Sequence, residues 1–324
     1  MSENIYISAN ETLSDLSVYI AGVKFRNPVI AASGTFGYGS EYSDLFDVSL
    51  LGGICTKALT MIPRTGNAGV RIWETPSGLL NSIGLENPGI HSFLEKELPR
   101  LRQAGPAIIA NLSGAASDEY INGASLLNQS DIDMIELNIS CPNVKAGGMT
   151  FGLDPGTAAA LTAAVRRVCS SKPLMVKLSP NAPSLPAVAL ACVKAGADAL
   201  SLVNTFKAMA IDTENRRPVF DSITAGLSGP AIRPIAIRMV WELFDTLKDA
   251  RAQVPIVGIG GIACANDAIE FLMAGAAAIQ VGSATFVNPH TMTDIIDGIQ
   301  HYMQSKDFSR VDEISLREAY GKNY

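Results

Sequence analysis

The sequence predicts an α/β protein built as a (β/α)8 TIM barrel, with an N-terminal β-hairpin closing its bottom and an insertion after the sixth strand. Eight short runs of apolar and β-branched residues recur along the chain, each followed by a Gly-, Ser- or Asn-rich stretch and an amphipathic or Ala-rich segment. The runs are almost continuously apolar, as in parallel strands buried on both faces. No proline-rich or low-complexity linker divides the chain, which predicts one domain.

The elements are expected in the following order. Residues 16–28 alternate around a central Ala-Gly pair, which predicts the hairpin. The eight expected strands are residues 27–33, 52–59, 106–114, 134–140, 173–180, 199–205, 255–262 and 278–284. Helices are expected at residues 156–171, which end on a basic turn, and at 185–196, which end on glycine. Residues 206–230 form the insertion, and loops of this length are usually lids or partner-binding elements.

The domain organisation follows from these elements. Residues 1–15 precede the hairpin without any motif, so we expect an N-terminal extension to which no role is assigned. Residues 16–324 are expected to form the single barrel domain.

The composition is that of a globular protein with a sizeable core. Of the 324 residues, 48% are hydrophobic and 17% charged, and the formal charge is -6. No overall positive field is therefore available to attract nucleic acid or an anionic membrane. No apolar run reaches the ~18 residues of a membrane span, and the first residues lack the basic start of a secretory signal. We expect a cytoplasmic protein without nucleic-acid or membrane partners.

The cysteines and histidines argue against a metal site. The five cysteines are Cys55, Cys141, Cys169, Cys192 and Cys264, and no two of them form a C-x-x-C pair. Their odd number and wide spacing disfavour a disulfide framework and a zinc or iron–sulfur site. The three histidines match no metal-ligand spacing, so we expect no bound metal.

Polar residues and glycines end many of the expected strands. Ligands of (β/α)8 barrels bind at the carboxyl ends of the strands. The last two strands end in the turns Gly260-Gly261 and Gly282-Ser283, and a helix is expected after the first of these turns. Bare backbone N–H groups and a helix N-terminus favour a phosphate site there. The alternative interpretation is that these glycines only ease tight turns.

Two lysines end otherwise apolar strands. Lys57 and Lys177 would each be costly to bury without a counter-charge, so each is expected to face an anionic or electron-rich ligand. The alternative is that a lysine pairs with a carboxylate such as Glu136.

Four asparagines suggest the shape of the ligand. Asn81, Asn138, Asn143 and Asn204 offer amide donors and acceptors, which match a planar ligand with alternating C=O and N–H groups. Asn81 and Asn143 could instead be turn formers. Asn138 lies within a strand run, where asparagine is disfavoured, so a ligand role is the stronger inference there.

Cys141 differs from the other cysteines by its position. It follows the fourth strand directly and precedes Pro142, whereas the other four are interpreted as buried hydrophobes. It is the acid–base candidate of its loop, provided that its pKa is lowered from the usual value of about 8.5.

Nine motifs, taken in order, form a pattern far more specific than any one of them. They read NPVIAASGTFGYGSEY, GICTKALT, NSIGLENPG, ELNISCPNVKAGGMTFG, VKLSPN, VNTFKAMAID, GLSGPAIRPIAIRMV, PIVGIGGI and AIQVGSATF. From about residue 16 to about residue 286, this pattern resembles the class 1 dihydroorotate dehydrogenases. The SCPNVKAGGMTFG loop and the KAMAID stretch favour class 1B, the FMN-binding catalytic subunit of the NAD-dependent enzyme, over the fumarate-dependent class 1A.

The resemblance implies an FMN site and a substrate site at the barrel mouth. The residues implied for FMN are Ser33, Gly34, Lys57, Ala58, Asn111, Asn138, Lys177, Val203, Gly229, Gly260, Gly261, Gly282 and Ser283. Those implied for dihydroorotate are Lys57, Asn81, Ser82, Ile83, Gly84, Leu85, Asn138, Asn143, Asn204 and Thr205. Cys141 is implied as the base that removes a proton from C5 while the C6 hydride passes to the flavin, giving orotate.

The resemblance also implies a partner. The chain has no dinucleotide fingerprint and no cysteine cluster, so FAD and a [2Fe-2S] cluster are expected on a separate electron-transfer subunit. The expected assembly is a heterotetramer around a homodimer of this chain. Three alternatives stay open: class 1A activity, a related FMN-dependent dihydropyrimidine or dihydrouridine enzyme, and a non-catalytic flavin or nucleotide sensor.

Overall fold

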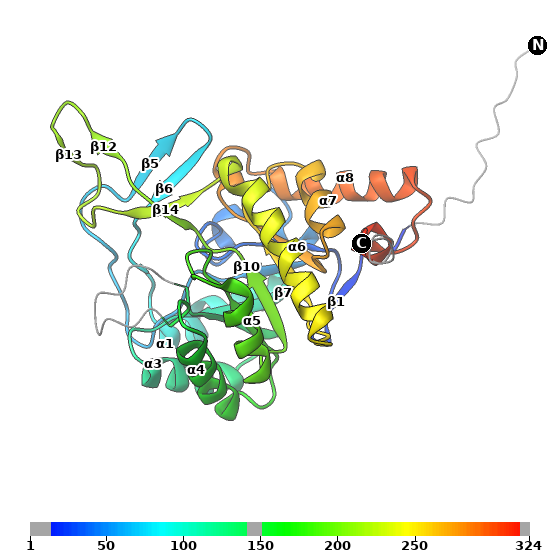
Figure 1. The fold of residues 1–324 in the computed structure, drawn as a ribbon, viewed down its shortest axis with the longest axis horizontal. Coiled ribbons are helices and arrows are strands. Elements are labelled where there is room, and N and C mark those ends of the chain that lie inside the picture. The colour runs from blue at the N-terminus through cyan, green and yellow to red at the C-terminus, as the bar shows by residue number, and fades with distance from the viewer. Residues whose placement is uncertain (1–13, 141–150, 318–324) are drawn as a thin grey trace, which may run out of the picture.

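A closed barrel of eight parallel strands forms the centre of the molecule (Figure 1). The computed structural model describes residues 14–140 and 151–317. The barrel strands are β3 (Val29–Ala31), β4 (Gly53–Cys55), β7 (Ala107–Leu112), β8 (Met134–Asn138), β9 (Leu174–Lys177), β10 (Ala199–Leu202), β15 (Ile256–Ile259) and β16 (Ala278–Val281). They pair in sequence order, and β16 closes the barrel by pairing with β3. The predicted TIM barrel is confirmed.

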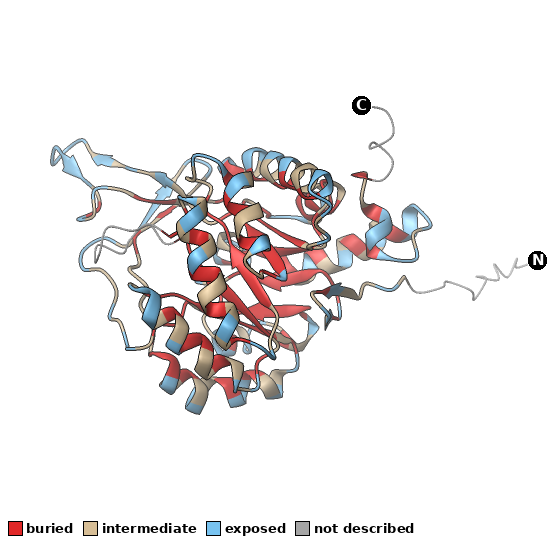
Figure 2. Cartoon of the chain, turned by 60° about the horizontal axis from the view of Figure 1, so that its bottom comes forward, coloured by how far each residue is buried: buried red, intermediate tan, exposed pale blue. Residues whose placement is uncertain are grey.

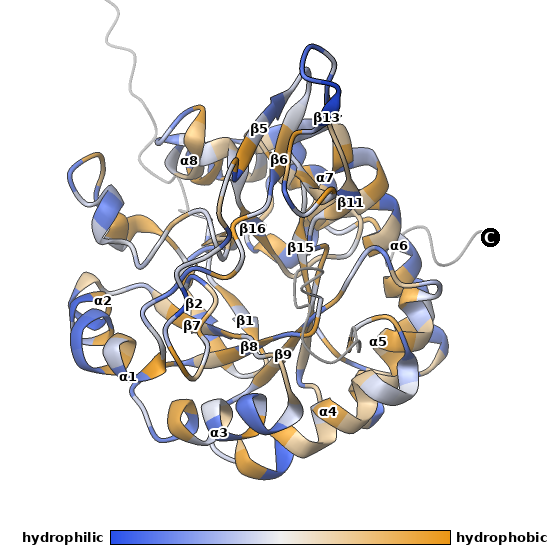
Figure 3. Ribbon diagram, turned by 90° about the vertical axis from the view of Figure 1, so that its left-hand side faces the viewer, coloured by the Kyte–Doolittle hydropathy of each residue, from blue (hydrophilic) through white to orange (hydrophobic). Residues whose placement is uncertain are grey.

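Helices surround the barrel, as Figure 3 shows in a view along its axis. They are α1 (Ile90–Ser92), a π-helical turn η3 (Phe93–Glu97), α2 (Leu98–Ala104), α3 (Ser117–Asn128), α4 (Pro155–Val168), α5 (Leu185–Lys194), α6 (Arg233–Asp249), α7 (Ala265–Met273) and α8 (Thr291–Ser305). Short 3-10 turns, η1 (Ser40–Tyr42) and η2 (Val48–Leu50), connect β3 to β4 instead of a helix.

Local sequence explains the bounds of the two helices that were predicted in detail. α4 begins after Asp154, whose side chain accepts a hydrogen bond from the N–H of Thr157, and Pro155 occupies its first position. Ser184 caps α5 in the same way, and Gly196 follows that helix with a φ of 102°. Both predicted helices are confirmed.

An antiparallel hairpin closes the amino end of the barrel. Its strands are β1 (Val18–Ile20) and β2 (Val23–Phe25), joined by Ala21 and Gly22, which both have positive φ. Ile20 and Phe25 are fully buried against the barrel residues Ile30, Cys55, Ile109, Met134, Met175, Ala199, Val257 and Ala278. The predicted role of the hairpin is confirmed, and the barrel strands are buried except for Ala107 at the start of β7 (Figure 2).

The barrel interior changes from apolar to polar along its axis. Side chains two residues apart on a strand share a face, so Met134, Glu136 and Asn138 of β8 all point inward at successive levels. The level above the apolar plug contains the buried polar residues Asn111, Glu136, Ser201 and Gln280. The next level, which includes Asn138 and Lys177, opens toward the carboxyl ends of the strands.

The insertion after β10 forms part of a second sheet that projects from the barrel (Figure 1). It contributes β11 (Phe206–Ala208), the small ribbon β12 (Ile211–Asp212) and β13 (Arg217–Pro218), and β14 (Ala225–Ser228). Strand β14 pairs with β6 (Gly78–Asn81), which pairs with β5 (Ile72–Thr75). The sequence analysis predicted no strands at residues 72–81, although the pattern Thr-Pro-Ser-Gly between them is a turn signal.

The two ends of the described chain meet beside the barrel. The N–H of Asp15 donates to the carbonyl of Ser309, and the Ser14 hydroxyl donates to the carbonyl of Phe308. Residues 1–13 of the expected extension lie outside the described residues. Within residues 14–140 and 151–317, no helix is both long and apolar enough to cross a membrane.

Candidate active site

A cavity opens at the carboxyl ends of the barrel strands, beneath the projecting sheet. Residues of β5, β6, β8, β9, β14 and β15 line it, together with residues of the segments that follow β3, β4, β6, β10, β14, β15 and β16. The predicted site residues in this lining are Ser33, Gly34, Lys57, Ala58, Asn81, Ile83, Gly84, Leu85, Asn138, Lys177, Val203, Asn204, Thr205, Gly229, Gly260, Gly261, Gly282 and Ser283. Segments far apart in the sequence thus meet around one space, although their roles toward a ligand stay predictions.

Two of the predicted site residues that the structure describes, Asn111 and Ser82, do not line this cavity. Asn111 lies one level deeper and Ser82 is buried behind the wall, where its hydroxyl contacts Asn67 and Ser222. Cys141 and Asn143 lie outside the described residues. The geometry therefore gives less support for direct contact of Asn111 and Ser82 with a ligand than the family resemblance implied.

Glycine leaves backbone bare on the wall formed by β15 and β16. Gly260 and Gly261 have φ values of 133° and 72°, which favour glycine. A Cβ on Gly261 would lie 2.7 Å from the carbonyl oxygen of Gly229, so any side chain would clash there. A Cβ on Gly34, across the cavity, would meet no atom within 4 Å, so a side chain there would occupy open space.

The N-terminus of the helix after the Gly260-Gly261 turn is less available to a phosphate than the sequence suggested. Asp267 in the first turn of α7 accepts hydrogen bonds from the N–H groups of Ala263 and Cys264, and it pairs with Arg233. The chain's own carboxylate thus occupies the positive end of this helix. The backbone of the two glycine turns lines the cavity and is the part of this wall that is open to an anion.

The two predicted lysines have different surroundings. The Lys57 ammonium lies 3.9 Å from a carboxylate oxygen of the half-exposed Glu86. The Lys177 ammonium is buried, 3.8 Å from Oε2 of Glu136 and 3.3 Å from the hydroxyl of Ser33. Pairing with Glu136, the alternative considered for these lysines, therefore occurs for Lys177, which nevertheless lines the cavity.

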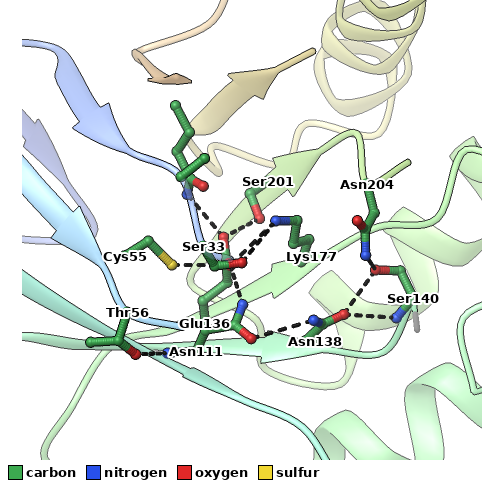
Figure 4. Close-up of polar contacts among 12 residues, drawn as sticks. Ser33, Cys55, Thr56, Asn111, Glu136, Asn138, Ser140, Lys177, Ser201 and Asn204 are labelled. Carbon is green, nitrogen blue, oxygen red and sulfur yellow. Dashed lines mark hydrogen bonds and ion pairs between the residues drawn. The ribbon is translucent and has the colours of Figure 1, made fainter. Parts of the chain in front are cut away.

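Glu136 is the centre of a buried polar cluster (Figure 4). Its Oε1 accepts hydrogen bonds from Ser201 Oγ at 2.8 Å and from Gln280 Nε2 at 2.9 Å. Its Oε2 accepts from Asn111 Nδ2 at 2.5 Å and from Cys55 Sγ at 3.2 Å. No pattern in the sequence indicated this cluster, because its members come from five different strands.

The electrostatics of the cluster keep Glu136 ionised. Complete burial by itself would raise the pKa of this carboxyl, but Lys177 and the hydrogen bonds from Gln280 and Ser201 outweigh it and lower the pKa below its ordinary value. Burial, reinforced by the neighbouring Glu136 carboxylate, raises the pKa of Cys55 well above its ordinary value. Cys55 is therefore a neutral hydrogen-bond donor.

A chain of amides and hydroxyls continues from the cluster to the cavity wall (Figure 4). Asn138 Nδ2 donates to Asn111 Oδ1 at 3.3 Å, and Asn138 Oδ1 accepts from the hydroxyl of Ser140 at 2.9 Å. Asn204 Nδ2 donates to the same hydroxyl at 2.7 Å. The hydroxyl of Ser140, the residue directly before position 141, thus links the predicted substrate-binding amides of Asn138 and Asn204.

The lining also includes residues that the sequence analysis did not name. They are Ala32, Thr35, Ile72, Leu79, Gly226, Ser228, Ile232, Ile259, Ile262 and Phe286. Ile72 and Leu79 belong to β5 and β6, so recognition of the Thr-Pro-Ser-Gly turn could have located them. The apolar side chains among them, such as Ile72, Leu79 and Phe286, suit the faces of a flat ring.

A family model described as dihydroorotate dehydrogenase matches residues 15–303. The chain belongs to the dihydroorotate dehydrogenase family. Three relatives are named "Dihydroorotate dehydrogenase B (NAD(+)), catalytic subunit". The Petrotoga mobilis protein is 56% identical over 300 residues, covering 93% of this chain and 98% of that protein. The Geotalea daltonii protein is 51% identical (93% and 97% covered) and the Caldicellulosiruptor saccharolyticus protein 50% identical (93% and 98%).

Membership of the dihydroorotate dehydrogenase family implies a flavin cofactor, FMN. The cavity suits this group, because bare backbone at the glycine turns is open to a phosphate and a buried cation borders the ring-sized space. Among residues 14–140 and 151–317, no cluster of three or more His, Cys, Asp or Glu side chains could hold a metal ion.

Proposed function

We propose that the chain is the FMN-binding catalytic subunit of an NAD-dependent dihydroorotate dehydrogenase, which oxidises (S)-dihydroorotate to orotate in pyrimidine biosynthesis. The observation that carries this proposal is the identity of half or more of the residues to relatives with that printed name over nearly their full length. The cavity supplies the matching chemistry, since it combines amides, two lysines and glycine turns.

The cofactor is proposed to lie across the cavity. FMN, when bound, supplies the acceptor for the hydride that leaves C6 of the substrate. Gly260, Gly261, Gly282 and Ser283 would hold its phosphate through backbone N–H groups, with Gly229 beside them. Lys177 would face the electron-rich edge of the ring as a buried cation.

The substrate is proposed to be held by the opposite wall. The amides of Asn81, Asn138 and Asn204 would read the C=O and N–H groups of the dihydropyrimidine ring. Lys57 would meet the substrate carboxylate, because its long contact with the half-exposed Glu86 leaves its ammonium available.

Cys141 is proposed to remove the proton from C5 of the substrate. It follows directly after Ser140, whose hydroxyl contacts both Asn138 and Asn204. The proposed base would therefore directly follow, in the sequence, the residue that links two of the amides proposed to orient the ring.

A partner subunit is proposed because the names of the relatives include "catalytic subunit" and "NAD(+)". We place FAD and a [2Fe-2S] cluster on that electron-transfer subunit, in a heterotetramer built on a homodimer of this chain. A cytoplasmic location fits the free thiols of Cys55, Cys169, Cys192 and Cys264.

Anaerobic spectroscopy of the purified chain tests the proposal. The protein should be yellow and should bleach on addition of dihydroorotate, and NAD⁺ should be reduced only when the electron-transfer subunit is present. Dihydrouracil is the matched control substrate, because it lacks the carboxylate. A colourless protein would favour a different ligand. Bleaching by dihydrouracil but not by dihydroorotate would favour a dihydropyrimidine enzyme. Rapid fumarate reduction by the isolated chain would favour class 1A.

A further inference from the structure

The buried carboxylate of Glu136 lies beneath the cavity without lining it. The side chain is 0% exposed and sits on β8 two residues before Asn138, which does line the cavity. Lys177 pairs in register with Asn138, and its ammonium lies 3.8 Å from the carboxylate below. Glu136 thus stands directly behind the one buried cation that the described lining contains.

The fold alone does not explain a charge at this depth. The level below contains only apolar side chains around Ile109, Met134 and Val257. A buried ion pair is often no more stabilising than apolar residues of the same volume. Nevertheless, four neutral donors from different strands converge on the Glu136 oxygens. The residues around Glu136 are therefore arranged so that its carboxylate stays ionised.

The contacts of Lys177 leave its ammonium able to bind something else. Its distances of 3.8 Å to Glu136 and 3.3 Å to Ser33 exceed the roughly 2.7–2.9 Å of a strong charged hydrogen bond. An ammonium has three donors, and this one borders the cavity. The ion pair therefore presents its positive end to the cavity and its negative end to the barrel interior (Figure 4).

We propose that Glu136 is a positioning residue, which holds the Lys177 ammonium at the cavity floor and, as its counter-charge, sets the reduction potential of the flavin bound above. This inference rests on the proposed function. A cation beside the ring favours the electron-rich reduced flavin, and an anion behind that cation offsets part of its field. Glu136 thus keeps the potential lower than a lone lysine would, which favours passing the electrons on to the next carrier.

The test compares the flavin midpoint potential of wild type and Glu136→Gln by anaerobic equilibration with a reference dye. The midpoint potential of the Gln variant should be more positive than that of wild type. The expected difference is at least tenfold in the equilibrium constant for flavin reduction, which is about 30 mV for a two-electron couple. Glu136→Asp should return the potential toward that of wild type. Cys55→Ala is the matched control, because it removes a neutral donor from the same carboxylate, and it should change the constant less than twofold.

An unchanged potential in a Glu136→Gln protein that retains flavin would overturn the inference. If that variant does not fold, the double variant Glu136→Gln/Lys177→Met replaces the ion pair by neutral groups. It should have a more negative potential than wild type, because the nearer charge is the cation, and a wild-type potential would again overturn the inference. A wild-type protein without flavin would instead contradict the proposed function.

Discussion

The two ends of the barrel interior are built on opposite principles. At the amino end, Ile20 and Phe25 of the hairpin plug a level made entirely of apolar side chains. At the carboxyl end, the same strands present Asn138, Lys177 and bare glycine backbone to an open cavity. Between them lies the Glu136 level, where four neutral donors from different strands converge on one carboxylate (Figure 4).

Stability and chemistry therefore depend on different ends of the barrel. Apolar packing stabilises the amino end without specifying any ligand. The carboxyl end carries groups that are costly to bury and whose use requires a bound molecule. Substitutions at the carboxyl end should therefore lower activity and leave stability unchanged, whereas substitutions at the amino end should lower stability and leave activity unchanged.

The largest effect is expected from Cys141→Ala at the carboxyl end. This variant should keep bound FMN and its melting temperature but lose flavin reduction by dihydroorotate by about 10²–10⁴-fold, as for a lost general base. Stopped-flow absorbance measures the reduction rate. Cys141→Ser is the matched variant and should retain slight activity at high pH. Near-wild-type reduction in the Ala variant would remove Cys141 from the mechanism.

Phe25→Ala should have the reverse effect at the amino end. It leaves a cavity in a fully buried apolar cluster, so the free energy of unfolding should fall by about 3–5 kcal/mol. The kcat of the remaining folded enzyme should be unchanged. Tyr19→Ala on the same hairpin is the control, because its side chain is 63% exposed and should cost less than about 0.5 kcal/mol. A loss of kcat in Phe25→Ala would show that the two ends are coupled.

Low pH should remove the stability that Glu136 contributes at the level between the two ends. The pKa of Glu136 is lowered in the folded state, so its stabilising contribution is complete above the ordinary value of 4.5 and is lost as the pH falls below it. Urea unfolding at several pH values between 6 and about 3 measures this loss. Glu136→Gln should show a shallower decline over that window than wild type. Parallel declines would contradict the assignment of a lowered pKa.

The smallest effect is expected in the hairpin turn. Ala21 has a φ of 48°, a conformation that disfavours a side chain, so Ala21→Gly should raise the stability by less than about 1 kcal/mol. Gly22→Ala is the opposite control: its added Cβ meets no atom within 4 Å, so the loss of about 1 kcal/mol would be conformational alone. Thermal unfolding measures both, and neither should change kcat. A destabilised Ala21→Gly would indicate that chain entropy dominates this turn.

Much of the fold could be predicted because its signals are local. A continuous apolar run marks a strand buried on both faces, and the residue that ends it marks the site-bearing edge. This logic located all eight strands and the wall residues at their ends, whereas alternation located the hairpin and the family resemblance supplied further wall residues such as Ile83 and Gly229. It failed at β5 and β6, because short, partly exposed strands of a projecting sheet lack such a run.

The sequence by itself thus determined the barrel, its polar end and the residues that end each strand, since these depend on the burial of neighbouring positions. Only the tertiary structure decided which side chains meet inside. Glu136 contacts Cys55, 81 residues away, and Gln280, 144 residues away. Such contacts depend on the register of each strand pair and on closure of the barrel, and neither leaves a local pattern in the chain.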